Sequence, residues 1–154
     1  MASRRDQIKM GEDELRDYLA AQKVMTCATI GPNGRPHLMP LWFVPEGMEL
    51  RAWTFAKSQK AKNLERDPRA TIQVEDGVEY QELRGVMMEC DVELEHDTEQ
   101  VTGFGMAIFD RYTEGSLGEE VRAMVRGQAA KRVGMTFRPT RTVSWDHSKL
   151  GGTY

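Results

Sequence analysis

The chain has 154 residues, 40% of them hydrophobic, with a formal net charge of −3 at pH 7 and a pI of about 5.7. This length predicts one domain, residues 1–154, that buries a core of its own. The acidic balance excludes a general nucleic-acid binder, because affinity for a phosphate backbone needs a broad positive surface. No apolar run approaches the length of a bilayer span, and no apolar stretch of a secretory signal follows the charged start, so we expect a soluble cytoplasmic protein without membrane contact.

The hydrophobic pattern predicts an N-terminal helix and then a run of antiparallel strands. The helix covers residues 12–22 and presents Leu15, Tyr18 and Leu19 on one apolar face. A hairpin follows, because an Asn-Gly pair lies between two strand-like segments. Strands are expected over residues 24–30, 35–44, 48–55 and 69–75, and over 79–95 as one bent or two short strands with the bend at Gly85.

Two more helices follow, each with a capping box at its start and an apolar stripe typical of core or dimer contacts. The boxes pair Asp97 with Gln100 and Ser116 with Glu119. The last two strands, 133–138 and 140–145, are expected to form a hairpin that bends at Pro139. The sum is a mainly β, α+β protein in which helices decorate a small antiparallel barrel.

The two cysteines give no sign of a disulfide or a metal site. Cys27 and Cys90 lie alone in apolar strand-like segments, without a second Cys or a His at ligand spacing. We therefore expect both to be buried, reduced thiols.

The most informative segment begins where the third strand ends, because it places cations at the start of a helix. Ser58 is a good N-cap, and a proline at position 68 ends the helix, which should span residues 59–66. Lys60 and Lys62 lie in its first turn and Lys57 just before it, although a helix N-terminus is already the positive end of the dipole.

Residues 57–69 hold five basic and two acidic side chains, a local charge of +3 in a chain of net charge −3. A bound anion, most simply a phosphate, would receive the free N–H groups, the hydroxyls of Ser58 and Thr54, and the lysines together. The alternative is a solvated basic helix that binds nothing.

The residues around this helix resemble a known family. The turn GPNG and the strand RPHLMPLWF, then Trp53-Thr54 and the run KSQKAKNLERDPRA, are similar to the split β-barrel flavin and deazaflavin oxidoreductases, whose prototype is pyridoxamine 5′-phosphate oxidase. The resemblance covers about residues 13–96. It implies an antiparallel split β-barrel, a homodimer with two cofactor sites at its interface, and hydride transfer in which the protein supplies positioning, electrostatics and exclusion of water.

In that family a Ser-Arg-Lys segment at the start of this helix holds the cofactor phosphate. Ser58 and Lys60 match it, whereas Gln59 stands in place of the arginine. The PLWF strand and the lysine-rich helix look more like the branch that binds coenzyme F420, a deazaflavin whose phosphodiester tail ends in glutamates. We therefore expect an F420-dependent reductase of a small conjugated organic molecule. The alternatives are an FMN-dependent oxidoreductase and a carrier that binds a flavin-like cofactor without turnover.

The resemblance also implies where the cofactor lies. The tricycle is expected against Pro40, Leu41 and Trp42, and the phosphate end at Thr54, Lys57, Ser58, Lys60 and Asn63. The second protomer would close the pocket with residues 80–84 or with the C-terminal segment. Structural alternatives are a core role for Trp42 and a local hydrogen bond for Asn63.

The C-terminal segment is rich in aromatic and basic residues, namely Trp145, His147, Lys149 and Tyr154. His147, next to Asp146, is a candidate proton donor, although a surface histidine is the stronger expectation. No catalytic residue and no metal site are predicted.

Overall fold

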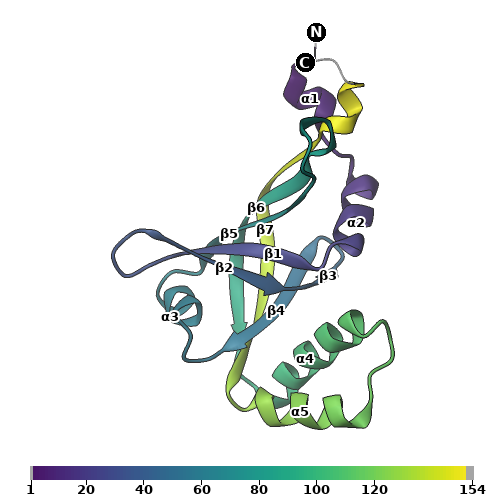
Figure 1. Cartoon of the computed structure of the whole chain (residues 1–154). Helices are drawn as coiled ribbons and strands as arrows, with labels where there is room; N and C mark the ends of the chain where they lie inside the picture. Colours follow the sequence, from purple (N-terminus) through teal and green to yellow (C-terminus); the bar gives the residue numbers. More distant parts are fainter. Residues whose placement is uncertain (1, 152–154) are drawn as a thin grey trace.

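The computed structural model describes residues 2–151, in which seven antiparallel strands form one curled sheet with helices around it (Figure 1). The strands are β1 (Val24–Ile30), β2 (Pro36–Trp42), β3 (Val44–Glu46), β4 (Glu49–Phe55), β5 (Arg69–Asp76), β6 (Arg84–Glu95) and β7 (Arg132–Asp146). The helices are α1 (Arg4–Ile8), α2 (Glu12–Ala21), α3 (Gln59–Arg66), α4 (Thr98–Tyr112) and α5 (Glu119–Ala129), with short 3-10 helices η1 (Tyr80–Glu82) and η2 (His147–Leu150). The α+β class and the antiparallel sheet expected from the sequence are confirmed.

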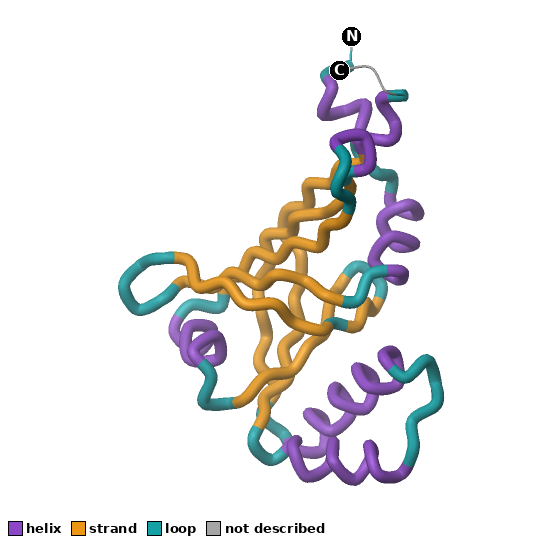
Figure 2. The backbone as a smooth tube through the Cα atoms, viewed as in Figure 1, coloured by secondary structure: helices purple, strands orange, loops and turns teal. Residues whose placement is uncertain are grey.

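The strand order is β2-β1-β5-β6-β7-β4-β3, so β2 and β3 lie at the two edges. The β1–β2 hairpin projects from the rest of the sheet, with α3 beside it, and α4 and α5 pack together near the opposite flank (Figure 2). Gly34, in the hairpin turn, has a φ of +79°, which explains the glycine of the Asn-Gly signal. Within residues 2–151, no helix has both the length and the apolar character that crossing a bilayer requires.

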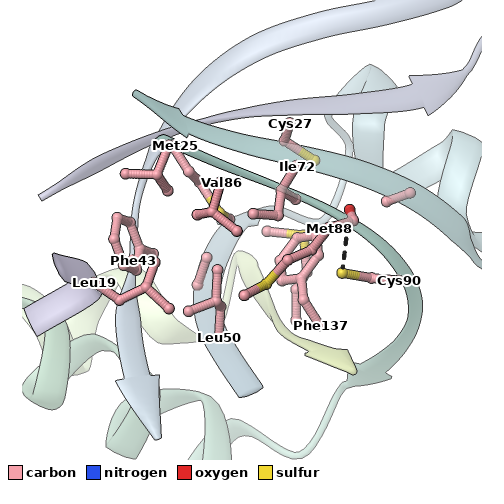
Figure 3. Packing of buried hydrophobic residues seen from close by; sticks show 14 of the residues in the cluster. Leu19, Met25, Cys27, Phe43, Leu50, Ile72, Val86, Met88, Cys90 and Phe137 are labelled. Carbon is pink, nitrogen blue, oxygen red and sulfur yellow. Dashed lines mark hydrogen bonds between the residues drawn. The ribbon is translucent and has the colours of Figure 1, made fainter. Parts of the chain in front are cut away.

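The main core fills the concave side of the sheet. Figure 3 shows Leu19 and Phe43 beside Leu50 and Met25, and all four side chains are essentially inaccessible to solvent. The predicted apolar face of α2 is confirmed, because its three apolar residues are buried. Both cysteines are buried free thiols in this core, and burial raises the pKa of each to about 12.

A second apolar cluster lies between β4 and the α4–α5 pair. Trp53 of β4 packs there against the buried Val101, Ile108 and Val125. The helical stripes predicted from the sequence therefore form core contacts. Arg111 attaches this layer to the rest of the molecule: its guanidinium donates to the carbonyl oxygens of residues 19, 20, 22 and 43.

The expected C-terminal hairpin is wrong, because β7 is one continuous strand of 15 residues. Its pairing with β6 shifts between Glu89 and Cys90, which face Arg141 and Pro139. Thr140 is thus the extra residue of a β-bulge. A bulge tolerates a proline, which cannot donate to the ladder, so the strand continues through the expected bend.

The bend expected at Gly85 is also wrong, because β6 runs unbroken from Arg84. A Cβ at this glycine would lie 2.5 Å from Cζ2 of Trp145 and 2.6 Å from the carbonyl oxygen of Val74. Gly85 therefore allows close packing across the sheet rather than a bend.

Hydrogen bonds at helix starts and the burial of side chains explain how the remaining helix and strand boundaries compare with those expected. Asp97 caps α4 as predicted, with its carboxylate accepting from the N–H of Gln100 at 3.1 Å. The box at Ser116 is wrong: this hydroxyl donates to the carbonyl of Thr113, and α5 begins after Gly118. The expected strand 35–44 is interrupted at Phe43, whose ring is drawn into the core, and α1 was not predicted.

Two glycines of α4 provide a test of the α4–β4 packing. A Cβ on Gly105 would lie 2.4 Å from Cζ3 of Trp53, so Gly105→Ala should lower the free energy of unfolding by about 1–3 kcal/mol. Gly103 has open space around it, and Gly103→Ala should raise the same quantity by about 0.5–1 kcal/mol. Urea denaturation of both variants checks this, and equal shifts would contradict the packing.

Candidate functional site

The start of α3 forms as the sequence predicts, directly after β4. The backbone turns at Phe55, whose carbonyl accepts from the N–H of Ser58 at 3.0 Å. The hydroxyl of Ser58 then accepts from the N–H of Ala61 at 3.2 Å and caps a helix that spans Gln59–Arg66. The positive end of this helix therefore lies at the end of β4.

Lys60 is buried at this helix start with only hydroxyl partners. Its Nζ donates to Oγ1 of Thr54 at 3.0 Å, and that hydroxyl donates to Oγ of Ser58 at 3.3 Å. The lysine is 8% exposed, and no carboxylate in residues 2–151 pairs with it. Burial lowers the pKa of its ammonium group. A buried charge without an opposite charge is costly, so this arrangement favours a bound anion.

The other basic residues of the segment divide by whether they already have a partner. Lys62 is exposed and pairs with Glu65 at 3.4 Å, and Arg69 pairs with Asp67 at 2.7 Å. Arg66 donates to the carbonyl oxygen of Ile30. Of the five basic residues in this segment, only Lys57 and Lys60 have no acidic or carbonyl partner in the described part of the chain.

Asn63 holds α3 on the sheet. It is fully buried, its Nδ2 donates to Oγ1 of Thr29 in β1 at 3.0 Å, and its Oδ1 accepts from Nε2 of Gln59 at 2.8 Å. The amide therefore fixes the helix that carries Lys60, and its groups are already paired.

The residues expected to contact the tricycle lie at a cavity that is separate from the start of α3. This cavity, of about 430 Å³, lies between the end of β2, the end of β4 and the α4–α5 pair. Its lining residues are Pro40, Leu41, Trp42, Trp53, Phe55, Ile108, Phe109, Met124, Gln128 and Arg132. Trp42 is 45% exposed and stacks on Tyr112 with ring centroids 3.9 Å apart. Such flat aromatic walls suit a planar conjugated molecule.

The structure thus places the predicted residues in two neighbouring groups rather than one. Alternation along β4 turns Thr54 toward α3 and its neighbour Phe55 toward the cavity. The two groups interact electrostatically, because Arg132, which lines the cavity, also lowers the pKa of Lys60. The end of β4 therefore lies between the basic start of α3 and an aromatic cavity.

Sequence reasoning missed Arg132 and Gln128. Arg132 is the first residue of β7, and only the β4–β7 pairing brings it opposite Phe55. Nothing in the local sequence signals that pairing. When strand pairing alone brings a side chain to a site, the residues next to it in the sequence form no recognisable motif.

A second cavity, of about 600 Å³, lies between the β1–β2 turn and the start of α3. Its lining includes Asn33, Arg35, His37 and Gln59. Gln59, where the family has arginine, thus faces the space beside the hairpin.

The C-terminal helix η2 packs beside α1, at the end of the molecule away from α4 and α5 (Figure 1). Nδ1 of His147 lies 2.9 Å from the carbonyl oxygen of Tyr80, and Lys149 pairs with Glu14 at 2.7 Å. Tyr154 falls outside the described residues. Within one chain, His147 is therefore remote from the cavity that contains Trp42.

Comparisons with known proteins give the same architecture. The family model described as pyridoxamine 5′-phosphate oxidase matches residues 12–145. The conserved hypothetical protein Rv2991 from Mycobacterium tuberculosis is 41% identical, covering 99% of this chain and 95% of that chain, with a TM-score of 0.89. A structure named F420 reductase is 27% identical, covering 82% of this chain and 94% of that chain, with a TM-score of 0.67. None of the curated proteins compared with this chain matches it significantly.

The curled antiparallel sheet defines the class first: a split β-barrel of the pyridoxamine 5′-phosphate oxidase type. The chain belongs to the pyridoxamine 5′-phosphate oxidase family. The family resemblance and the fold expected from the sequence are both confirmed.

The burial of Lys60 has a consequence for its titration. Because burial favours the neutral amine, its pKa should lie below the ordinary lysine value of about 10.4. Below that lowered pKa the side chain is charged and attracts anions; as the pH rises through it, the charge and the attraction are lost. Sulfate, whose charge is constant over this range, should raise the pKa of Lys60 by favouring the ammonium form.

NMR titration of the lysine Cε resonances measures this, with Lys60→Arg to assign the signal. An unshifted pKa, or one that sulfate leaves unchanged, would contradict an anion site at the start of α3.

Proposed function

We propose that this protein is a coenzyme F420-dependent reductase of a small conjugated organic molecule. The observation that carries the proposal is the buried ammonium of Lys60, held by the hydroxyl of Thr54 at the capped start of α3 and paired with no carboxylate in residues 2–151. The capped helix end, the two hydroxyls and the charge together form a receptor for a phosphodiester.

The deazaflavin is preferred to FMN for two reasons. Gln59 stands where the FMN oxidases of the family have an arginine, so this site should bind the terminal phosphomonoester of FMN less tightly. Lys57 is exposed and unpaired in the described chain, and it is placed to meet the glutamates of a longer anionic tail. The solved F420 reductase, 27% identical to this chain, supports the same choice.

The protein's own residues would bind and orient the cofactor and would exclude water from the reacting atoms. Lys60, Ser58 and Thr54 would hold the phosphodiester, and the backbone at Pro40, Leu41 and Trp42 would meet the polar edge of the ring. When bound, the reduced deazaflavin supplies a hydride for an electron-poor carbon of the substrate. The aromatic walls of the 430 Å³ cavity keep water from that carbon.

Replacement of Lys60 tests the proposal directly. Lys60→Met keeps the length of the side chain and removes a charged donor worth about 1.5–3 kcal/mol, so F420 affinity should fall roughly tenfold to hundredfold. Fluorescence titration of F420 measures this. Lys62→Met, at an exposed lysine already paired with Glu65, is the matched control and should leave the affinity unchanged.

A wild-type protein without affinity for F420 would overturn the proposal. A yellow protein that releases FMN on denaturation would favour the FMN-dependent alternative, and tight F420 binding without reduction of any acceptor would favour a carrier.

We also propose that the protein is a homodimer in which β2 is covered by a second copy. β2 is an edge strand without a charged residue, and Leu38 and Trp42 on one of its faces are 58% and 45% exposed. Such an edge invites pairing unless it is covered. This apolar face continues into the cavity through Pro40 and Trp42, so a second copy here would also close the cavity.

Sedimentation velocity tests the dimer. The wild-type protein should sediment with twice the mass of the chain, and Leu38→Lys should shift it toward the monomer by placing a charge in the interface. Val78→Lys, at an apolar residue 89% exposed on another part of the surface, should remain dimeric. A monomeric wild type, or equal behaviour of the two variants, would rule out this interface.

A further inference from the structure

The aromatic cavity holds one cation that nothing in the described chain neutralises. Arg132 places its guanidinium carbon 4.0 Å from the ring centroid of Phe55 and 4.5 Å from that of Trp53. Its Nε is buried without a hydrogen-bond partner, and no carboxylate in residues 2–151 lies within ion-pair distance. The two rings therefore hold a charged group that still has donors to offer.

A second residue of the cavity lining also has a polar atom without a partner. Oε1 of Gln128, in the last turn of α5, is buried and has no partner. The rest of the lining is apolar, and half of its residues are aromatic. Buried polar groups without partners are rare and costly, so two of them in one cavity indicate the polar groups of a ligand.

Two other arginines near this layer contrast with Arg132. Arg126, two residues before Gln128 on α5, pairs with Glu119 at 2.5 Å, and Arg111 donates to four backbone carbonyls. Arg132 has neither kind of partner in the described residues. Its stacking on two rings holds it in place but leaves its charge uncompensated.

We propose that Arg132, with Gln128 beside it, binds the carboxylate of the substrate and thereby orients a planar conjugated acid in the cavity. A guanidinium matches a carboxylate through two parallel hydrogen bonds, and the low polarity of the walls strengthens that pair. The neutral amide of Gln128 adds a hydrogen bond to a hydroxyl or amide of the same molecule. This assignment gives the proposed reductase a substrate class and rests on that proposed function; Lys60 keeps its separate role at the cofactor.

The test uses trans-cinnamate, a conjugated carboxylate, and its neutral analogue cinnamamide, without cofactor. Trp42 and Trp53 line the cavity, so quenching of tryptophan fluorescence reports binding. Wild type should bind cinnamate at least tenfold more tightly than cinnamamide. Arg132→Met should abolish that preference and leave the affinity for the neutral cinnamamide within twofold of wild type.

Two more variants complete the design. Arg132→Lys retains the charge but not the paired geometry, so it should retain part of the preference for cinnamate. This variant provides the test if Arg132→Met does not fold. Arg126→Met removes an arginine that does not line the cavity and should change nothing.

The outcomes separate this inference from the proposed function. Equal binding of the acid and the amide by wild type, or a loss of F420 rather than cinnamate affinity in Arg132→Met, would overturn the role of Arg132. Cinnamate preference in a protein that has no F420 affinity would keep the role of Arg132 and reject the cofactor.

Discussion

The pairing of β7 with two strands is the constraint on which the rest of the molecule depends. Along its length β7 bonds to β6, and its first residues also bond to β4, so one strand joins the two halves of the sheet. Gly134 lets the ring of Phe104 from α4 lie directly on this strand, since a Cβ there would be 2.8 Å from that ring. The same pairing that closes the sheet therefore seats α4 and places Arg132 opposite Phe55.

Two partly buried cations without carboxylate partners, Lys60 and Arg132, occupy opposite sides of the end of β4. A charge that is buried and unpaired lowers stability, and a protein retains it where a ligand supplies the opposite charge. Their separation fits our proposal that the helix start receives the phosphodiester of the cofactor, while the aromatic cavity receives the cofactor ring and a planar acid. The scaffold around them is rigid, because Asn63 ties α3 to β1 and the paired strands fix Arg132.

Much of the fold could be predicted because its signals are local. The Asn-Gly turn, the capped helix after β4 and the apolar face of α2 each depend on a few adjacent residues, and each formed as expected. The errors arose where a local signal met a distant partner. The local sequence predicts a bend at Pro139, yet pairing with β6 makes this residue part of a bulge. The local sequence also predicts a helix cap at Ser116, whose hydroxyl instead donates to the carbonyl of Thr113.

For the site, the sequence alone predicted the capped, lysine-rich start of α3, where we propose that an anion binds. The cap, the lysines and the helix dipole all belong to one short segment, so their chemistry could be read without the fold. The tertiary structure decided which of those lysines is buried without a partner, and it brought Arg132 and Gln128 to the cavity behind Trp42. The physical reason is that burial and strand register are set by contacts between residues far apart in the chain, which no local pattern records.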